Sequence, residues 1–189
     1  MDRHLTIASK FEIEGTIGEI SPLGPGFIND TFIVKTLEGP KYILQRKNHH
    51  VFPDVPGMMN NIMMVTEHIK SKVIAGGGDP MREALTVTRR KASTLTDSEK
   101  GLPYCDLYYK DEDGNFWAVC LFIEGSVTYE QADTPKLAYN GGQGIGKFQS
   151  QLADFTTPLS ETIKGFHNIR WRFEQWDAAV KADAAGRVK

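Results

Sequence analysis

The sequence lacks an apolar run of the roughly 20 residues that a membrane-spanning helix needs, and its N-terminus has no basic region followed by an apolar core. These absences predict a cytoplasmic protein without a membrane partner. An excess of one charge is also missing, since 22 basic residues stand against 24 acidic ones and the formal net charge is −2. This balance argues against nucleic acid as a partner, because phosphate backbones are bound by clustered Lys and Arg.

Cysteine is scarce as well. The two that occur are Cys105 and Cys120, and without a secretory signal we expect buried, reduced thiols rather than a disulfide. The five histidines form no metal-binding pattern: His49 and His50 are adjacent, and His68 has no further ligand at a suitable spacing. The sequence therefore predicts no zinc site.

What the sequence does contain is an ordered series of secondary-structure signals. Apolar residues alternate over residues 13–20, 27–36 and 40–48 with short connections, which predicts three antiparallel strands. Over residues 56–74 the period changes to three and four, which predicts one long helix. The glycines and the proline of residues 75–80 end that helix, because neither residue type continues it cheaply.

Further β signals cover residues 84–90, 104–109 and 116–125, and an Asp-Gly pair joins the last two as a hairpin. From residue 134 onward the pattern is helical. Strands with one inserted helix, followed by helices alone, predict an α+β lobe and the beginning of a helical one.

Residues 141–147 (GGQGIGK) match the G-x-x-x-x-G-K spacing of a phosphate-binding loop. However, Phe148 stands where that motif has the Ser or Thr that holds magnesium, and no strand precedes the segment. We interpret these glycines as part of a helix, where they let another element approach closely. The Asp-Phe pair of residues 154–155 lacks the glycine of the kinase magnesium motif and is interpreted as a helix terminus.

The loop of residues 21–32 (SPLGPGFINDTF) leads to a functional hypothesis. Its glycines allow main-chain N–H groups to close over the phosphates of a nucleotide, although Pro25 removes one donor. Asn29 and Asp30 are also ordinary turn residues, so a purely structural role for them stays open. The candidate binding residues of the loop are Gly24, Gly26, Asn29, Asp30 and Thr31.

The elements that follow supply the other parts of a phosphoryl-transfer site. Gln45 or Arg46 on the third strand is placed to reach the phosphates, and Glu67 of the long helix would orient that residue by an ion pair or a hydrogen bond. Alternatives without a binding role stay open for both residues: Glu67 as a solvated glutamate of the helix and Arg46 as an ordinary surface cation. The segment after the last strand offers main-chain groups to adenine, with candidates Phe122, Ile123 and Glu124.

Five segments form an ordered set along the chain: PLGPGFINDTFIV, YILQRKNHHVFPDV, NNIMMVTEHI, FIEGSVTYE and GIGKFQSQLADF. Together they resemble the N-terminal part of the aminoglycoside-phosphotransferase-like kinases, and within that family the N-acetylhexosamine 1-kinase branch. The resemblance implies a protein-kinase-like N-terminal lobe over residues 1–125, with a five-stranded antiparallel sheet and one long helix. It implies a hinge and the start of a truncated helical lobe over residues 126–189. It also implies ATP and Mg²⁺ as cofactors and a sugar hydroxyl, such as that of an aminosugar, as acceptor.

One part of that pattern is missing. No histidine in the sequence is followed by Gly-Asp or Arg-Asp, the start of the catalytic loop in such kinases. We therefore expect an N-terminal fragment of a sugar phosphotransferase that does not catalyse by itself. The alternative is a non-catalytic module that binds a nucleotide or a partner. An aminosugar sulfatase is disfavoured, because neither cysteine stands in a Cys-x-Pro-x-Arg context.

The last helical segment is rich in large apolar residues. If the lobe is truncated, this segment lacks its packing partner and exposes an apolar surface. We expect self-association through that surface, or a disordered C-terminal segment. The residues concerned are Trp171, Phe173, Trp176 and Val180.

Overall fold

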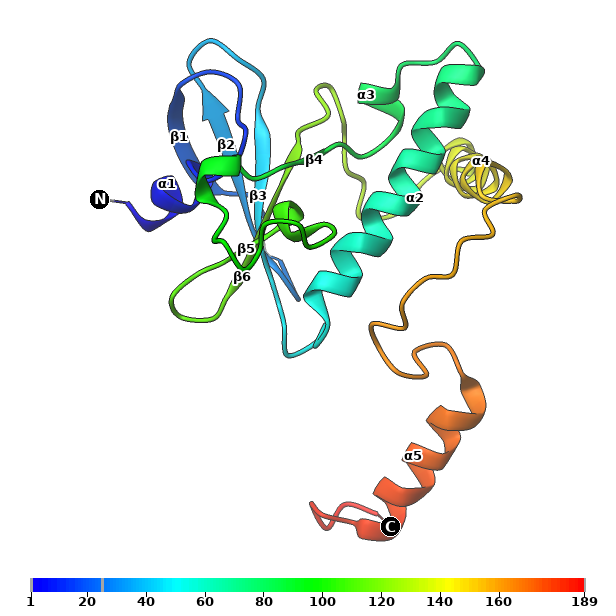
Figure 1. The fold of residues 1–189 in the computed structure, drawn as a ribbon. Helices are drawn as coiled ribbons and strands as arrows, with labels where there is room; N and C mark the ends of the chain where they lie inside the picture. The colour runs from blue at the N-terminus through cyan, green and yellow to red at the C-terminus, as the bar shows by residue number, and fades with distance from the viewer. Residues whose placement is uncertain (1, 25, 189) are drawn as a thin grey trace.

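The computed structural model describes residues 2–24 and 26–188 (Figure 1). Its centre is a six-stranded antiparallel sheet with the strand order β1-β2-β3-β6-β4, and β5 also pairs with β6. The strands are β1 (Ile17–Pro22), β2 (Asp30–Thr36), β3 (Tyr42–Lys47), β4 (Val87–Thr88), β5 (Tyr109–Lys110) and β6 (Phe116–Leu121). The expected α+β class is confirmed. The sheet has six strands, one for each of the six β signals in the sequence, rather than the five that the resemblance implies.

Five α-helices surround or follow the sheet. The long helix predicted for residues 56–74 is confirmed as α2. It begins after Asp54, whose carboxylate accepts from the Gly57 N–H at 2.9 Å, and it ends at Gly76. The α-helices are α1 (Arg3–Ala8), α2 (Val55–Ala75), α3 (Pro80–Glu83), α4 (Pro135–Gln151) and α5 (Ile169–Ala182).

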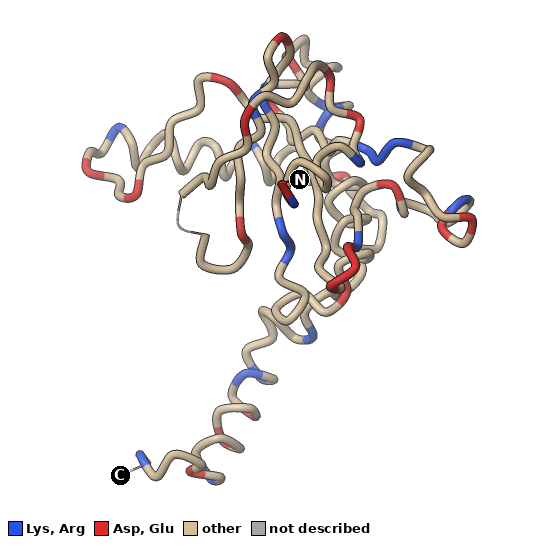
Figure 2. Tube along the Cα trace, turned by 90° about the vertical axis from the view of Figure 1, so that its left-hand side faces the viewer, with Lys and Arg blue, Asp and Glu red and all other residues tan. Residues whose placement is uncertain are grey.

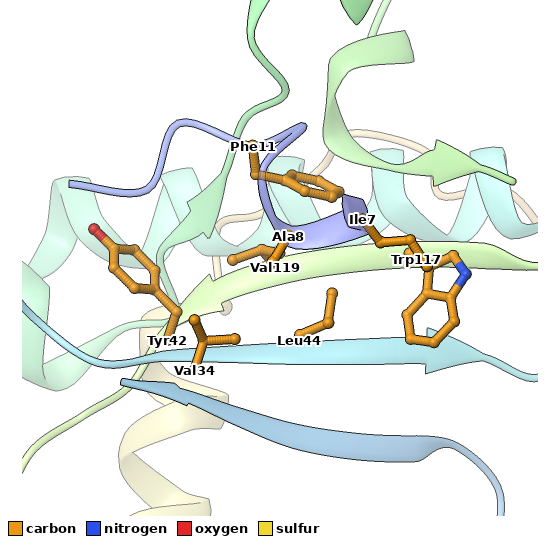
Figure 3. Packing of buried hydrophobic residues seen from close by; sticks show 8 residues of the cluster. All are labelled: Ile7, Ala8, Phe11, Val34, Tyr42, Leu44, Trp117 and Val119. Carbon is orange, nitrogen blue, oxygen red and sulfur yellow. The ribbon is translucent and has the colours of Figure 1, made fainter. Parts of the chain in front are cut away.

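Both faces of the sheet are covered. On one face α1 packs against alternate residues of β2, β3 and β6, as Figure 3 shows; this cluster contains Ile7, Ala8, Phe11, Val34, Tyr42, Leu44, Trp117 and Val119. On the other face α2 packs against the remaining alternate positions, with Val55, Met59, Met63, Val87, Leu107 and Ala118. Strand β6 therefore sends neighbouring residues into two different cores, Val119 into one and Ala118 into the other.

The segment between β4 and β5 is less regular than predicted. The strands expected over residues 84–90 and 104–109 are reduced to two residues each, and Cys105–Leu107 forms a 3-10 turn. The cause is Arg90, which is 3% exposed and therefore needs acceptors around its guanidinium. Glu99 accepts at 2.7 Å, and the Tyr108 carbonyl accepts at 3.3 Å. The chain winds around this buried cation instead of extending.

Helix α4 confirms the helical interpretation of residues 141–147, but it corrects the reason given for the glycines. A Cβ atom at Gly141, Gly142, Gly144 or Gly146 would meet no atom within 4 Å beyond its own helix. The expected close approach of another element is therefore wrong for the described residues. These glycines lie on an exposed face of α4.

The end of α4 is tied to α2 by polar contacts. Asp154, just past the helix end as predicted, pairs with Lys72 and lies 3.1 Å from His68 Nε2. The hydrogen bond from Lys72 holds the pKa of Asp154 below its ordinary value. Further along, Asn61 and the Ser160 main chain exchange two hydrogen bonds of 2.8 and 2.9 Å.

Helix α5 projects away from the sheet and α2 (Figure 1). Phe173 and Trp176 are about 60% exposed, so the expected apolar surface is confirmed for them, while Trp171 and Val180 are half-buried. Figure 2 shows charges of both signs spread over the chain. Among the described residues, no helix combines the length and the apolar character that crossing a membrane requires.

The β5–β6 hairpin is held by one carboxylate. Asp111 accepts hydrogen bonds from Trp117 Nε1 at 2.7 Å, from Arg3 Nη2 at 2.8 Å and from the Asn115 N–H at 2.8 Å. Burial works to raise the pKa of Asp111, but these hydrogen bonds outweigh it and hold the pKa below its ordinary value. The carboxylate therefore stabilises the fold in its ionised form and joins α1 to the hairpin.

We expect Asp111→Asn to lower the free energy of unfolding at pH 7 by about 2 kcal/mol, because hydrogen bonds to a charged acceptor are lost. A lowered folded pKa makes this contribution complete above the unfolded pKa of about 3.8. It is lost as the pH falls through the folded pKa, so the two proteins should converge in strong acid. Urea unfolding at several pH values measures this. Asp113→Asn, at an exposed neighbouring carboxylate that also pairs with Arg3, is the control and should change little.

Candidate functional site

The loop between β1 and β2 has a shape that its glycines impose. Gly24 has a φ of +68°, in the left-handed region, and a Cβ on Gly26 would stand 2.0 Å from the Asn29 carbonyl oxygen. The tip is solvent-exposed, with Phe27 fully and Ile28 half accessible. The predicted hairpin is thus confirmed, whereas the prediction made for Pro25 lies outside the described residues.

Asn29 joins this loop to the end of β3. Its Oδ1 accepts the Asn48 N–H at 2.9 Å, and at the base of the loop the Leu23 N–H donates to the Thr31 carbonyl at 2.8 Å. The structural role left open for Asn29 is therefore present in the fold. Its amide nitrogen faces no partner among the described residues.

Strand β3 separates the two candidates for phosphate contact. Gln45 pairs in register with Thr31 and Ala118, and Ala118 belongs to the core under α2. Arg46 lies on the opposite face, because neighbouring strand residues alternate. Gln45 and Arg46 therefore cannot act on the same ligand from the same face of the sheet.

Arg46 already has a carboxylate partner. Its guanidinium forms an ion pair with Asp30, the residue opposite it on β2, and Nη1 donates to Asn115 Oδ1 at 3.4 Å. This pair is about half exposed, so its net contribution to stability is small. The charge of Arg46 is largely matched by Asp30 before any ligand arrives.

Lys47 was not among the predicted site residues, yet it shares the α2 face with Gln45. Its ammonium donates to Gln45 Oε1, and Gln45 Nε2 in turn donates to Thr31 Oγ1 at 3.0 Å. A chain of polar side chains therefore crosses from β3 to β2 beside the loop. The strand period of two was the available signal, since Lys47 is the next residue on the face of Gln45.

The ammonium group of Lys47 is less solvated than that of an ordinary lysine. Burial lowers its pKa, and burial raises the pKa of the neighbouring Cys120 thiol to about 11, with the nearby lysine charge opposing that rise. Among the described residues, no carboxylate lies within ion-pair distance of Lys47. Lys47 is a half-buried ammonium whose partner is a neutral amide. Cys105 and Cys120 are both free thiols, as expected, but only Cys105 is buried, while Cys120 is half-buried.

A pocket of about 200 Å³ lies where the loop, the end of β3 and the β5–β6 hairpin meet. It is polar and cationic, and among the described lining residues the apolar side chain is that of Ile28 at the tip of the loop. The lining residues are Ile28, Asp30, Arg46, Lys47, Asn48, His49, His50 and Asn115. Of the predicted residues, the pocket brings together Asp30 and Arg46.

Glu67 does not make the predicted contact with β3. Its carboxylate pairs with Lys70, one turn along α2, at 3.0 Å. It lines a separate pocket of about 600 Å³ between α2 and β4, together with Lys70 and Arg89. The helical period explains this, because Met63 and Thr66 take the sheet-facing positions and leave Glu67 at the margin.

The segment after β6 has two main-chain groups already engaged. The Phe122 N–H donates to the Lys41 carbonyl at 3.0 Å, and the Ile123 carbonyl accepts from Ser126 Oγ at 2.9 Å. The Glu124 side chain pairs with Lys41 at 3.1 Å. Within the described part of the chain, the Phe122 carbonyl and the Ile123 N–H have no such partner.

The loop and this segment lie at opposite ends of β3. Lys47 pairs with Phe116 and Tyr42 with Leu121, so the two ends are separated by about 17 Å along the strand. A ligand that contacts both must lie along the strand direction. No group of three or more His, Cys, Asp or Glu side chains suited to a metal ion occurs among the residues described.

The two loop glycines give a direct test of the loop geometry. Gly26→Ala should displace the loop and break the Asn29–Asn48 hydrogen bond, because the new methyl group overlaps the Asn29 carbonyl. Gly24→Ala has open space and should cost about 1 kcal/mol through its positive φ alone. The amide resonance of Asn48 in two-dimensional NMR reports the difference. Equal shifts in both variants would contradict the close approach at Gly26.

No protein-family model matches this chain.

Proposed function

We propose that this chain is the nucleotide-binding lobe of an ATP-dependent phosphotransferase that acts on a sugar, of the aminoglycoside-phosphotransferase-like type and with an aminosugar as the acceptor class. The observation that carries the proposal is the cationic pocket under the glycine hairpin, where Lys47 has no carboxylate partner among the described residues. A site of this kind suits a phosphate group, which supplies the missing negative charge.

The arrangement of elements supports the same proposal. A glycine-bearing hairpin, a third strand with a cation, a long helix and a connecting segment after β6 follow each other in the order that the sequence resemblance implies. In this chain Lys47 takes the phosphate-binding role that was expected of Gln45 or Arg46. Gln45 holds the ammonium in place and is itself held by Thr31.

The other parts of the nucleotide fall along β3. The adenine is assigned to the Phe122 carbonyl and the Ile123 N–H, which lie directly after β6 and have no hydrogen-bond partner among the described residues. The loop tip, with Phe27 and Ile28, covers the phosphates from the opposite end. Glu67 is left out of this site, because its carboxylate pairs with Lys70 in a different pocket.

The described residues contain no cluster of three acidic, His or Cys side chains that would hold a metal ion by itself. No step is therefore assigned to magnesium, which stays an expectation for the full-length protein, where one or two carboxylates and the phosphates would bind it. The sequence also contains no His-Gly-Asp segment that would supply a catalytic base. Phosphoryl transfer by this lobe therefore requires catalytic residues from outside this sequence.

A second candidate function is a nucleotide- or partner-binding module without chemistry. The same absence of a catalytic-loop motif favours it. The complete reading frame of the gene distinguishes the enzyme from the binding module. The enzyme is supported if the frame continues into a His-Gly-Asp motif and its product phosphorylates N-acetylglucosamine or N-acetylgalactosamine from labelled ATP. A complete product that binds nucleotide and phosphorylates no sugar in a panel supports the module.

The nucleotide site is tested by titration of a fluorescent ATP analogue into the 189-residue chain. Binding should be weak, because the proposal assigns to this chain only one wall of the nucleotide cleft. Lys47→Met should weaken it about tenfold, equivalent to about 1.4 kcal/mol, since the apolar stem stays while the charge is lost. Affinity should also fall as the pH rises toward the lowered pKa of Lys47, below the range of an ordinary lysine.

The matched control is Lys35→Met, which removes a lysine from the neighbouring strand β2, outside the lining of the pocket. Because Glu19 already pairs with that charge, affinity should change less than twofold. Thermal unfolding of each variant shows that the fold is intact. No binding by the parent chain, or equal losses in the two variants, would overturn the assignment of Lys47.

A further inference from the structure

Helix α5 carries an apolar face that the described structure leaves uncovered. Ile169, Phe173 and Trp176 are between 59% and 70% exposed, and they line a shallow groove of about 260 Å³ with Arg172. Trp171 points elsewhere and packs on Gly165, where a Cβ would stand 2.4 Å from its ring. The helix itself is well formed, with the Asn168 side chain capping the Trp171 N–H at 3.2 Å.

The spacing of this face is that of a coiled-coil seam. Ile169, Phe173, Trp176 and Val180 follow each other at intervals of four, three and four residues, the pattern of alternating a and d positions. Arg170 and Asp177 occupy the two equivalent flanking positions, one heptad apart. We call these four apolar residues the α5 seam.

Two copies of the α5 seam match each other when the helices run antiparallel. The two aromatic residues then face each other in the centre, Phe173 on Trp176 of a second copy and the reverse. Ile169 of each copy meets Val180 of the other at both ends. The large aromatic residues therefore pair with each other, and so do the smaller aliphatic residues. Such a two-fold contact is self-complementary, as closed dimers require.

Charge complementarity selects the same arrangement. In the antiparallel pair, Arg170 of each copy flanks the seam next to Asp177 of the other, giving two opposite-charge contacts related by symmetry. A parallel pair is disfavoured by shape. The rest of the chain lies beyond the N-terminal end of α5, a helix about 21 Å long (Figure 1). A parallel pair would place both of these bulky parts at the same end, whereas an antiparallel pair would place them at opposite ends.

We propose that the α5 seam is a homodimerisation surface, and that two copies of this chain associate through antiparallel α5 helices with Phe173 and Trp176 at the centre. This surface is separate from the nucleotide pocket and does not depend on the proposed function. Because α5 spans only two heptads, the dimer is expected to dissociate on dilution.

Sedimentation equilibrium of the 189-residue chain at several concentrations tests the proposal. The expected result is a monomer–dimer equilibrium. Phe173→Asp places a charge in the seam and should weaken the dimer at least about tenfold, with little change in thermal stability because the side chain is exposed. The control is Ala178→Asp, which adds the same charge on α5 outside the seam and should leave the dimer unchanged.

A charge exchange tests the orientation. Arg170→Asp alone and Asp177→Arg alone place like charges together and should each weaken the dimer, and the double variant should restore it. A chain that stays monomeric throughout would overturn the proposal. A dimer unaffected by Phe173→Asp would also overturn it, and would point to the exposed Ile145 and Phe148 of α4 instead. A double variant that fails to recover excludes the antiparallel seam.

Discussion

The structure depends on the alternation of strand β3, because this central strand has a core on each side. Leu44 is fully buried under α1, while its neighbour Gln45 belongs to the face covered by α2. A shift of one residue in the register would exchange these faces and place Arg46 against the α2 core. The same alternation separates a cation that is balanced by a carboxylate, Arg46, from one that is not, Lys47. The chemistry of the pocket thus follows from the packing of the sheet.

The regular elements could be predicted from the sequence, because each has a strong local signal. The alternating strands, the glycine hairpin and the long helix after Asp54 all lie close to their expected positions. The segment between β4 and β5 could not be predicted, since its course is set by the burial of Arg90 and by an ion pair with Glu99, nine residues away. Apolar periodicity contains no information about where a buried guanidinium finds its acceptors.

In the candidate site, too, some features could be predicted from the sequence and others could not. Residue types were sufficient to identify the loop glycines and the strand that bears the cation, and the close contact at Gly26 agrees with the need for glycine there. Side-chain direction was harder to predict. Glu67 was expected to reach β3, but its place at the margin of the α2 face directs it to Lys70. The glycines of α4 serve no close contact in the described structure, and nothing in it explains them.

The anchoring of the β1–β2 loop has a consequence for the thermodynamics of ligand binding. Gly24 and Gly26 shape the turn, and Asn29 ties the loop to Asn48, so among the described loop residues the tip at Phe27 and Ile28 is the part without such constraints. Ordering two residues costs about 2–4 kcal/mol of backbone entropy. Covering the fully exposed Phe27 side chain returns about 2–3 kcal/mol through the hydrophobic effect. Opening and closing of the tip are therefore nearly balanced, so that the charge of the proposed nucleotide would decide its affinity.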